Sequence, residues 1–459
     1  MTLSSSMFIF GLLPWFLLFV WVTRNIKNSR KIFLMIANSI FYIWSGVGGF
    51  LFFCVYIVCI WLLCKLLQKT KNNKYLFICI ILIAIAPLLV TKYYNFTIRT
   101  INTWFRCPLE ELTWLIPTGI SFFTFEAVAL LLDIHSGAIG STPCLSDTFL
   151  YLSFFPTVTS GPIIRYADFQ KSLYHWNQQI NYNDCLRLLI IGLSKKLLIA
   201  DKIAPLANYY FDGIAMGNKY SGLGLWVGSI AYTLQIYFDF SGYSDIAISI
   251  AGMLGFEVKK NFDKPYQAKS ITEFWRKWHI SLSQWFRDYI YIPLGGNRCS
   301  KKRNCINLLI VWFLTGLWHG ADWTYIIWGV GYCLILIIEK YTQAVKIIAK
   351  KKGAYFYTLF FVNILWVIFR AENLSNAKDY ILGMFQFNCF FNLEPKAIRY
   401  LPFIILVFLL CLPYKSLAEK LDHCRWIPPI IEVGLVILAF LDVCTIANTT
   451  YVPFIYGMF

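Results

Sequence analysis

Charged side chains are scarce in this sequence. Only 14% of its 459 residues are Asp, Glu, Lys or Arg, whereas 58% are hydrophobic and 19% are aromatic. The mean hydropathy is +0.59. A soluble domain of this length could not bury so much apolar surface, which excludes an ordinary soluble protein. The composition therefore predicts a multi-pass membrane protein in contact with lipid.

Acidic residues are few relative to basic ones. The chain has 24 Asp and Glu against 41 Lys and Arg, a net charge of +17, which in another context would suggest a nucleic-acid partner. The cations do not line one face, however. They cluster between apolar runs, at 24–31, 65–74, 298–303 and 346–352. Such loops face the cytosol in membrane proteins, so we predict no nucleic-acid partner.

Paired cysteines and internal repeats are also lacking. The 14 cysteines are irregularly spaced, without a C-x-x-C pair, and we expect neither a disulfide nor a metal site. No repeat of fixed period is visible, which argues against a transporter built from duplicated halves. The apolar run Met7–Val22 has no basic residues before it and no cleavage site after it. We therefore expect it to be a retained first span.

Apolar runs interrupted by Gly and Pro fill most of the chain. Phe33–Leu67 is too long for one crossing and is broken at Ser45–Gly49, and Leu150–Ile164 contains the broken-helix sequence FFPTVTSGPII. Late spans are expected at Tyr355–Arg370, Tyr400–Pro413 and Ile430–Phe440. We predict an all-α bundle of about 10–13 transmembrane or re-entrant helices. It should form one integral-membrane domain over residues 1–459.

The stretch Ile271–Trp328 carries most of the polar chemistry. It sets His279 and His319 among tryptophans, arginines and glycines inside an otherwise apolar chain. Desolvating an imidazole within a membrane-length segment costs free energy, so a histidine there usually titrates, transfers a proton or holds a partner. The alternative is a structural, hydrogen-bonded histidine, and it carries more weight for His279 than for His319.

Two segments around these histidines have a predictable geometry. Ser281–Ile292 repeats its apolar residues at helical spacing, which predicts an amphipathic helix at the membrane surface. Ile306–Ile338 lies between basic flanks and must enter the membrane and return. Limbs of about sixteen residues span about 24 Å, less than a hydrocarbon core of about 30 Å. The turn Gly316–Trp323 is therefore expected inside the bilayer, with His319 about 20 Å from the cytosolic edge, beside a water-filled reaction chamber.

The same residues resemble a known family. WRKWHISLSQWFRDYIYIPLGGNR and TGLWHGADWTYIIWG are similar to the signature of the membrane-bound O-acyltransferases, and above all to the bacterial branch that holds the alginate O-acetyltransferase membrane subunit. Other segments of the chain also resemble the family and occur in the same order as in its members. They are IPTGISFFTFEAVALLLDI, FFPTVTSGPIIRY, YTLQIYFDFSGYSDIAISIAGMLGF, NFDKPYQAKSITEFW and the terminal PFIYGMF. The resemblance implies a helix bundle around a central tunnel.

The resemblance also implies acyl transfer, with His319 as the catalytic residue in the middle of the tunnel and His279 in the same site. An imidazole with a reference pKa of about 6.5 is suited to remove the proton of a hydroxyl acceptor. A thioester donor releases a thiol whose pKa is about 8.5, so protonation of this leaving group is less demanding. We expect His319 to be the general base, His279 an orienting or donor-side partner, and acetyl-CoA the acyl donor, with no bound cofactor.

Further substrate contacts are expected around the two histidines. Candidate hydrogen-bond donors to the oxyanion of the tetrahedral intermediate are Trp318, Trp323 and Tyr243. Arg287 and Arg298 at the cytosolic mouth are candidates to bind coenzyme A phosphates, although the basic loop that follows is also explained as a topology signal. Asp322 and Glu126 stand where the family pattern has Asn and Gln, which leaves their part in substrate choice open.

Three functions remain open at this point. The resemblance favours transfer of acetyl from cytosolic acetyl-CoA across a bacterial inner membrane to an exported, alginate-like polysaccharide, through an extracytoplasmic SGNH-type acetyltransferase. The same chemistry could serve peptidoglycan O-acetylation or the D-alanylation of teichoic acid. From a different class, a proton-coupled transporter could use the intramembrane histidines together with Asp133, Asp239 and Asp245 as a relay.

Overall fold

The computed structural model describes residues 3–23, 26, 28–70, 73–113, 117–174, 180–342, 353–386, 391–411 and 427–448. In these ranges every regular element is a helix and none is a strand, which confirms the predicted all-α class. The basic loop 346–352 and the terminal PFIYGMF lie outside the described residues.

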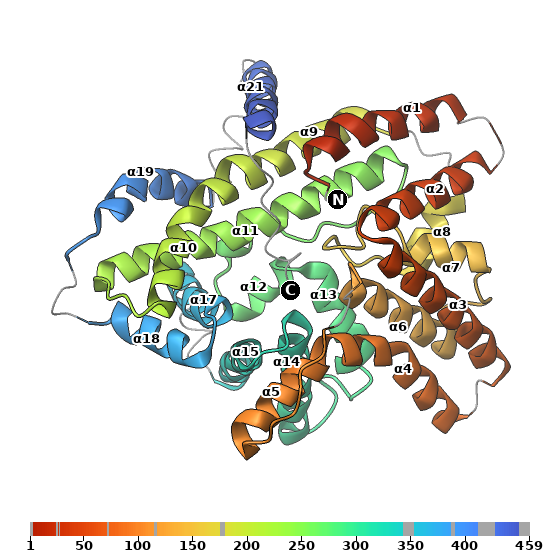
Figure 1. Cartoon of the computed structure of the whole chain (residues 1–459), viewed down its shortest axis with the longest axis horizontal. Helices are drawn as coiled ribbons and strands as arrows, with labels where there is room; N and C mark the ends of the chain where they lie inside the picture. Colours follow the sequence, from red (N-terminus) through yellow and green to blue (C-terminus); the bar gives the residue numbers. More distant parts are fainter. Residues whose placement is uncertain are drawn as a thin grey trace. The chain divides into compact units, whose positions relative to one another are not determined.

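The internal contacts of the chain divide it into two compact units. The first comprises Met1–Leu186 and Ile246–Lys259, and the second comprises Arg187–Asp245 and Lys260–Phe459. A single domain over the whole chain stays a prediction. The α labels below are those of Figure 1, and η denotes short π- or 3-10-helical elements.

Helices of the first unit come mainly from the N-terminal third of the chain. They are η1 (Met7–Leu12), α1 (Leu13–Thr23), α2 (Ser29–Trp44), α3 (Val47–Lys69), α4 (Lys74–Leu88), η2 (Leu89–Tyr93), α5 (Tyr94–Phe105), α6 (Ile120–Ser136), α7 (Leu145–Leu152) and α8 (Tyr166–Tyr174). The helix α9 (Tyr182–Ser194) begins in this unit and ends in the second.

The second unit holds the rest of the helices. They are η3 (Lys195–Ala200), α10 (Asp201–Ala215), α11 (Gly222–Met253, whose end belongs to the first unit), η4 (Pro265–Gln267), α12 (Ile271–Lys277), α13 (Ile280–Phe286), η5 (Arg287–Tyr291), α14 (Lys301–His319), α15 (Trp323–Tyr341), α17 (Ala354–Arg370), α18 (Leu374–Met384), α19 (Pro395–Leu410) and α21 (Ile427–Asn448).

Several helices have the length and composition of membrane spans. In the described part of the chain, four are long and apolar enough to cross a bilayer: Val47–Lys69, Lys74–Phe105, Trp323–Tyr341 and Ile427–Asn448. Shorter apolar helices occupy Met7–Thr23 and Ala354–Arg370. These helices fit a polytopic membrane protein, while the count of 10–13 membrane helices and the central tunnel stay predictions.

Breaks in the first unit fall where Gly and Pro predicted them. The run Phe33–Leu67 forms two helices, α2 and α3, which separate at Ser45 and Gly46 and pack on each other. Leu150–Ile164 is a broken helix, because α7 ends at Leu152 and turns follow. A Cβ on Gly119, at φ +79°, would lie 2.6 Å from the carbonyl oxygen of Val158, so only glycine lets α6 begin against this turn.

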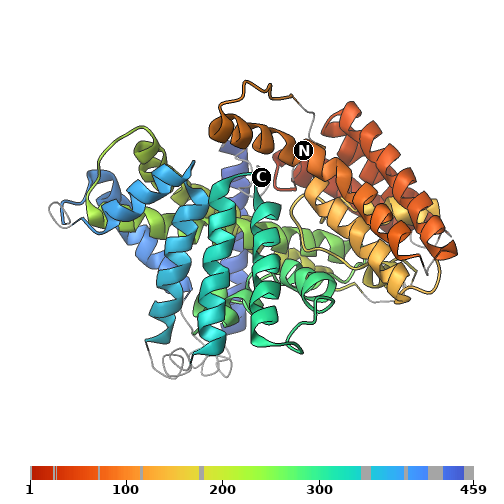
Figure 2. The ribbon, with the colours of Figure 1, turned by 90° about the horizontal axis from the view of Figure 1, so that it is seen from below.

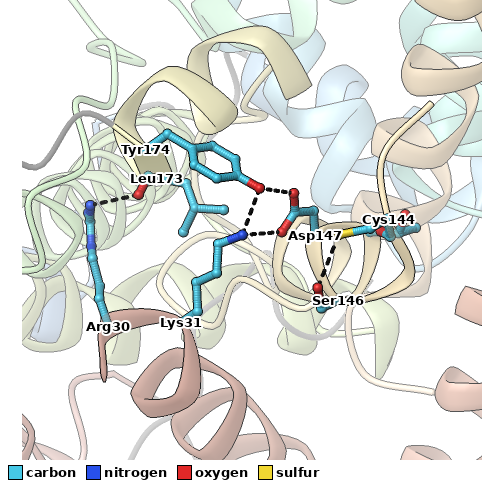
Figure 3. A network of polar contacts seen from close by, with 8 residues as sticks. Arg30, Lys31, Cys144, Ser146, Asp147, Leu173 and Tyr174 are labelled. Carbon is cyan, nitrogen blue, oxygen red and sulfur yellow. Dashed lines mark hydrogen bonds and ion pairs between the residues drawn. The ribbon is translucent and has the colours of Figure 1, made fainter. Parts of the chain in front are cut away.

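A polar cluster joins the start of α2 to α7 and α8 (Figure 3). Lys31 Nζ donates to Asp147 Oδ1 at 2.9 Å and to the Tyr174 hydroxyl at 2.6 Å, and that hydroxyl donates to Asp147 Oδ2 at 2.5 Å. The neighbouring Arg30 donates to the backbone oxygen of Leu173 at 3.4 Å. Because the Asp147 carboxylate is buried, its two donors compensate the loss of hydration and fix the ends of three helices together.

The second unit contains the predicted helical hairpin. Its limbs are α14 and α15, and α15 packs between α14 and α17 (Figure 2). The predicted sixteen-residue limbs are wrong, since each limb has 19 residues. Ser300 caps α14 by accepting from Arg303 N at 3.4 Å, so the helix begins within the basic loop. Asp322 caps α15 by accepting from Thr324 N at 3.1 Å.

The limbs are longer than the apolar run because α14 begins with basic, exposed residues of the loop. Nineteen residues extend about 28 Å, close to the thickness of a hydrocarbon core of about 30 Å. The turn is reduced to Gly320–Asp322, and His319 is the last residue of α14 rather than part of a non-helical loop. His319 therefore lies at the end of α14 opposite the basic loop, and its depth in the membrane stays a prediction.

Candidate active site

His279 lies at a sharp corner between two short helices. The helix α12 starts at the N-cap Ser270, whose hydroxyl accepts from Glu273 N at 3.0 Å, and α13 starts directly after His279. The predicted amphipathic helix Ser281–Ile292 is present as α13 and η5. His279 is fully buried and adopts a left-handed backbone conformation, φ 43° and ψ 56°. Burial lowers the pKa of His279 to about 3, so its ring is neutral at pH 7.

His319 lies in a box of aromatic rings. It is 2% exposed. Its ring centroid is 4.9 Å from those of Trp318 and Trp328 and 5.4 Å from that of Phe369. The Trp318 ring also contacts His279, at 5.7 Å between centroids. The hairpin and the corner thus bring the two predicted catalytic histidines to the same tryptophan.

A large polar cavity of about 840 Å³ reaches the wall of this box. Phe369 and Tyr325, whose rings are 4.9 Å apart, both line it. Phe369 thus contacts His319 and also lines the cavity, so its ring lies between the imidazole and this space. Exposed residues at the rim, Met216 and Glu372, connect the cavity to the surface of the second unit.

The floor of this cavity is ionic. Lys196 is buried and pairs with Asp239 at 2.6 Å and with Asp201 at 2.8 Å. The Gln235 side chain is 8% exposed, and its Oε1 accepts no hydrogen bond in the described part of the chain. Because a buried unpaired carbonyl costs about 1–3 kcal/mol, Gln235 is a natural partner for a ligand hydroxyl.

A second, smaller cavity of about 150 Å³ lies beside α12 and α14. Trp275 and Trp312 form part of its wall, and the Trp275 ring is 5.7 Å from that of Trp328, which in turn contacts His319. Arg287 also lines it, and its hydrogen bond to Asp288 at 2.6 Å holds the pKa of the guanidinium above its usual value. The aromatic box thus has a polar cavity on one flank and a mainly apolar one on another.

Comparison with known proteins was made for the whole chain. The family model for the membrane-bound O-acyltransferase family matches residues 88–376, which include both histidines and the residues around both cavities. The chain belongs to this family. It is therefore an O-acyltransferase, a membrane enzyme that uses an acyl donor, as the sequence predicts.

Relatives of this O-acyltransferase include three kinds of bacterial protein. It is 38% identical to the probable alginate O-acetylase of Pseudomonas aeruginosa, over 84% of this chain and 75% of that one. It is 34% identical to the peptidoglycan O-acetyltransferase of Helicobacter pylori, over 84% and 80% of the two chains. The teichoic acid D-alanyltransferase of Bacillus subtilis is 28% identical, over 61% and 72%.

The other predicted site residues of the O-acyltransferase are dispersed. Asp322 lines the large cavity and Arg287 the small one. Trp323 starts α15 half-buried, Tyr243 is buried in α11, and Arg298 is exposed in the loop before α14. These three are not among the residues that line the two cavities.

Sequence reasoning missed several residues around the site. Lys196, Gln235 and Arg370 line the large cavity, and Trp328 contacts His319. The Trp328 indole is fully buried, and its N–H has no hydrogen-bond partner in the described ranges. A signal existed for Lys196, because a lysine in an apolar segment is expensive unless it is paired or functional. Nothing in the sequence separates Trp328 from the many tryptophans that only pack.

Proposed function

We propose that this O-acyltransferase takes acetyl from cytosolic acetyl-CoA and passes it across a bacterial inner membrane for the O-acetylation of an exported, alginate-like polysaccharide. The identity to the probable alginate O-acetylase over most of both chains supports the acetyl group and the polymer. One observation carries the mechanism: His319 contacts Phe369 on the wall of a polar cavity and Trp328 beside a mainly apolar one.

The direction of transfer follows from the orientation of the hairpin. The helix α14 begins in the basic loop and ends at His319, and basic loops face the cytosol. The large cavity is lined by Asp322, the N-cap of α15, and by Arg370, the last residue of α17, and we assign it to the extracytoplasmic side. The small cavity, next to Arg287, belongs to the donor side, where Arg287 and the exposed Arg298 meet the phosphates of coenzyme A.

In the proposed step, His319 takes the proton of the acceptor hydroxyl while the oxygen attacks the thioester carbonyl. The tetrahedral oxyanion then collapses, the carbon–sulfur bond breaks, and the imidazolium returns the proton to the thiolate of coenzyme A. Trp328, as a buried indole N–H beside His319, is a better placed oxyanion donor than Trp323. Trp318, in contact with both imidazoles, remains a candidate.

The charge of the large cavity supports transfer through a partner protein. Five acidic residues line it against two basic ones: Asp201, Asp212, Asp239, Asp322 and Glu372 against Lys196 and Arg370. A cavity with this excess of negative charge repels a polyanionic polymer such as a uronate chain. A neutral or basic hydroxyl carrier, such as a segment of an extracytoplasmic SGNH-type acetyltransferase, enters it at lower cost.

Inverted membrane vesicles test the proposal, because they expose the cytosolic face to added [14C]acetyl-CoA. We expect release of the coenzyme A thiol and label in the vesicle lumen from wild type, and neither from His319→Ala. His135→Ala is the matched control, since His135 stacks on Phe77 in the first unit, with 3.9 Å between ring centroids. Equal turnover in His319→Ala would remove His319 from the chemistry.

Three acceptor arms separate the remaining alternatives. Vesicles loaded with mannuronate oligomers plus an SGNH-type acetyltransferase, with peptidoglycan fragments, or with teichoic acid are compared. Labelled mannuronate is the expected result. Label in peptidoglycan would mean that peptidoglycan, not an alginate-like polysaccharide, is the acceptor. Activity only with a D-alanyl carrier protein would mean that this carrier, not acetyl-CoA, is the donor.

A further inference from the structure

The segment before α12 holds the corner at which His279 lies. Ile280 N donates to the backbone oxygen of Asn261 at 2.9 Å, and Asp263 N donates to that of Lys277 at 2.9 Å. His279 lies between these two hydrogen bonds with a positive φ of 43°. A non-glycine residue in that region is strained and persists only where its surroundings hold it, as they often do in functional sites.

The side chain of Asn261 is oriented by a group that can only donate. Its Oδ1 accepts from Ser281 N at 3.1 Å and from Ser281 Oγ at 2.9 Å. Since a backbone N–H has no acceptor capacity, the amide oxygen rather than the amide nitrogen must face Ser281. The amide nitrogen then donates to Ser244 Oγ at 3.4 Å. Asn261 is 1% exposed, so water does not compete for these contacts.

This orientation decides which nitrogen of His279 carries the proton. His279 Nδ1 lies 3.3 Å from the same Asn261 Oδ1. The contact is a hydrogen bond only if Nδ1 is the donor, and a neutral imidazole has a single N–H. We propose that Asn261 is a positioning residue that fixes His279 in the tautomer with the proton on Nδ1, so that Nε2 is an acceptor within the acyl-transfer site.

The proposal gives His279 a definite part in the reaction, and for that part it rests on the proposed function. A neutral ring whose Nε2 carries the lone pair accepts a hydrogen bond and cannot stabilise an oxyanion. His279 therefore orients a substrate group that donates to it, next to the Trp318 ring shared with His319. The strained backbone corner and the hydrogen bond to Asn261 together orient the His279 ring. The hydrogen bond to Asn261 also fixes the tautomer.

Nitrogen-15 NMR of histidine-labelled protein in detergent micelles reads the tautomer directly. The chain has only 5 histidines, and loss of one set of signals in His279→Gln assigns that ring. We expect a protonated Nδ1 in wild type and in Asn261→Asp, which keeps an acceptor at the same place. Asn261→Leu removes the acceptor and should populate the Nε2–H form. Ser281→Ala is the matched control, since it leaves the Asn261–His279 contact intact and should keep the wild-type tautomer.

Three results would overturn the proposal: an Nε2–H ring in wild type, an Nε2–H ring in Asn261→Asp, or an unchanged tautomer in Asn261→Leu. If Asn261→Leu does not fold, the wild-type and Asn261→Asp spectra still decide, because an unprotonated Nδ1 in either contradicts the assignment. Turnover of acetyl-CoA should fall at least about tenfold in Asn261→Leu and be rescued in Asn261→Asp. If the tautomer is as expected but no variant consumes acetyl-CoA, the proposed function fails and the tautomer stands.

Discussion

Replacing Glu339 by glutamine should loosen α12, the helix that leads to His279. Glu339 is a buried residue near the end of α15. Its carboxylate accepts from Ile271 N at 2.6 Å, from Thr272 N at 2.8 Å and from the Thr272 hydroxyl at 2.6 Å. The two backbone N–H groups belong to the first turn of α12, where no intrahelical acceptor exists for them. One side chain of α15 therefore caps a helix from outside.

The size of the effect follows from these bonds. A hydrogen bond to a charged group contributes about 1.5–3 kcal/mol, and a buried donor left unpaired adds a penalty. In Glu339→Gln one oxygen becomes an NH2 group, which faces a backbone N–H as a second donor. At least one charge-assisted bond is lost, so opening of α12 should become easier by about 2 kcal/mol, or about 30-fold in the opening equilibrium.

Hydrogen–deuterium exchange of peptides covering residues 268–282 measures this opening in the purified membrane protein. Exchange there should rise about 30-fold in Glu339→Gln. Glu432→Gln is the matched control, because Glu432 belongs to an exposed ion pair with Arg187 and such pairs contribute little. Unchanged exchange in Glu339→Gln, or an equal rise in the control, would refute the reasoning.

Two further predictions concern the charged groups. Lys196→Met leaves the buried Asp239 and the half-buried Asp201 without their cation and should destabilise the protein by about 3–5 kcal/mol in a denaturant titration. Lys195→Met, at a more exposed pair, should cost clearly less in the same titration, and equal losses would contradict this. Burial raises the pKa of Glu273, but hydrogen bonds from Lys277 and from Lys269 N outweigh it and leave the pKa below 4.5. The stabilisation of α12 by the Glu273 carboxylate is therefore present at neutral pH and should be lost as the pH falls below about 4.5. Hydrogen–deuterium exchange of α12 in wild type and in Glu273→Gln should then converge below this pH. A difference between the two proteins that stays constant with pH would disprove the prediction.

The sequence predicts the ends of helices well where helix-breaking residues such as Gly and Pro interrupt an apolar run. The separation of α2 from α3 follows from Ser45 and Gly46, and the broken segment after α7 follows from its prolines and glycine. The hairpin at His319 was also predictable, because basic flanks on both sides force the chain to return. Its limb lengths were not, since Ser300 caps α14 inside a loop that hydropathy treats as polar.

The site was predictable only in part. Motif similarity brings His279, Trp318 and His319 together, and the structure places them in contact. Lys196 reaches the large cavity from η3 and Gln235 from α11, and only the packing of distant helices decides which side chains share a cavity. Tyr243 and Arg298 line neither of the two cavities, and their contacts with substrate stay predictions.

The rate of coenzyme A thiol release by His319→Gln at saturating acetyl-CoA tests the central claim most directly. Glutamine keeps a polar side chain of similar size in the box formed by Trp328 and Phe369 but removes the base. We expect turnover to fall about 100- to 10,000-fold, the range of general-base catalysis, while the affinity for acetyl-CoA is unchanged. Turnover equal to that of wild type would contradict the account.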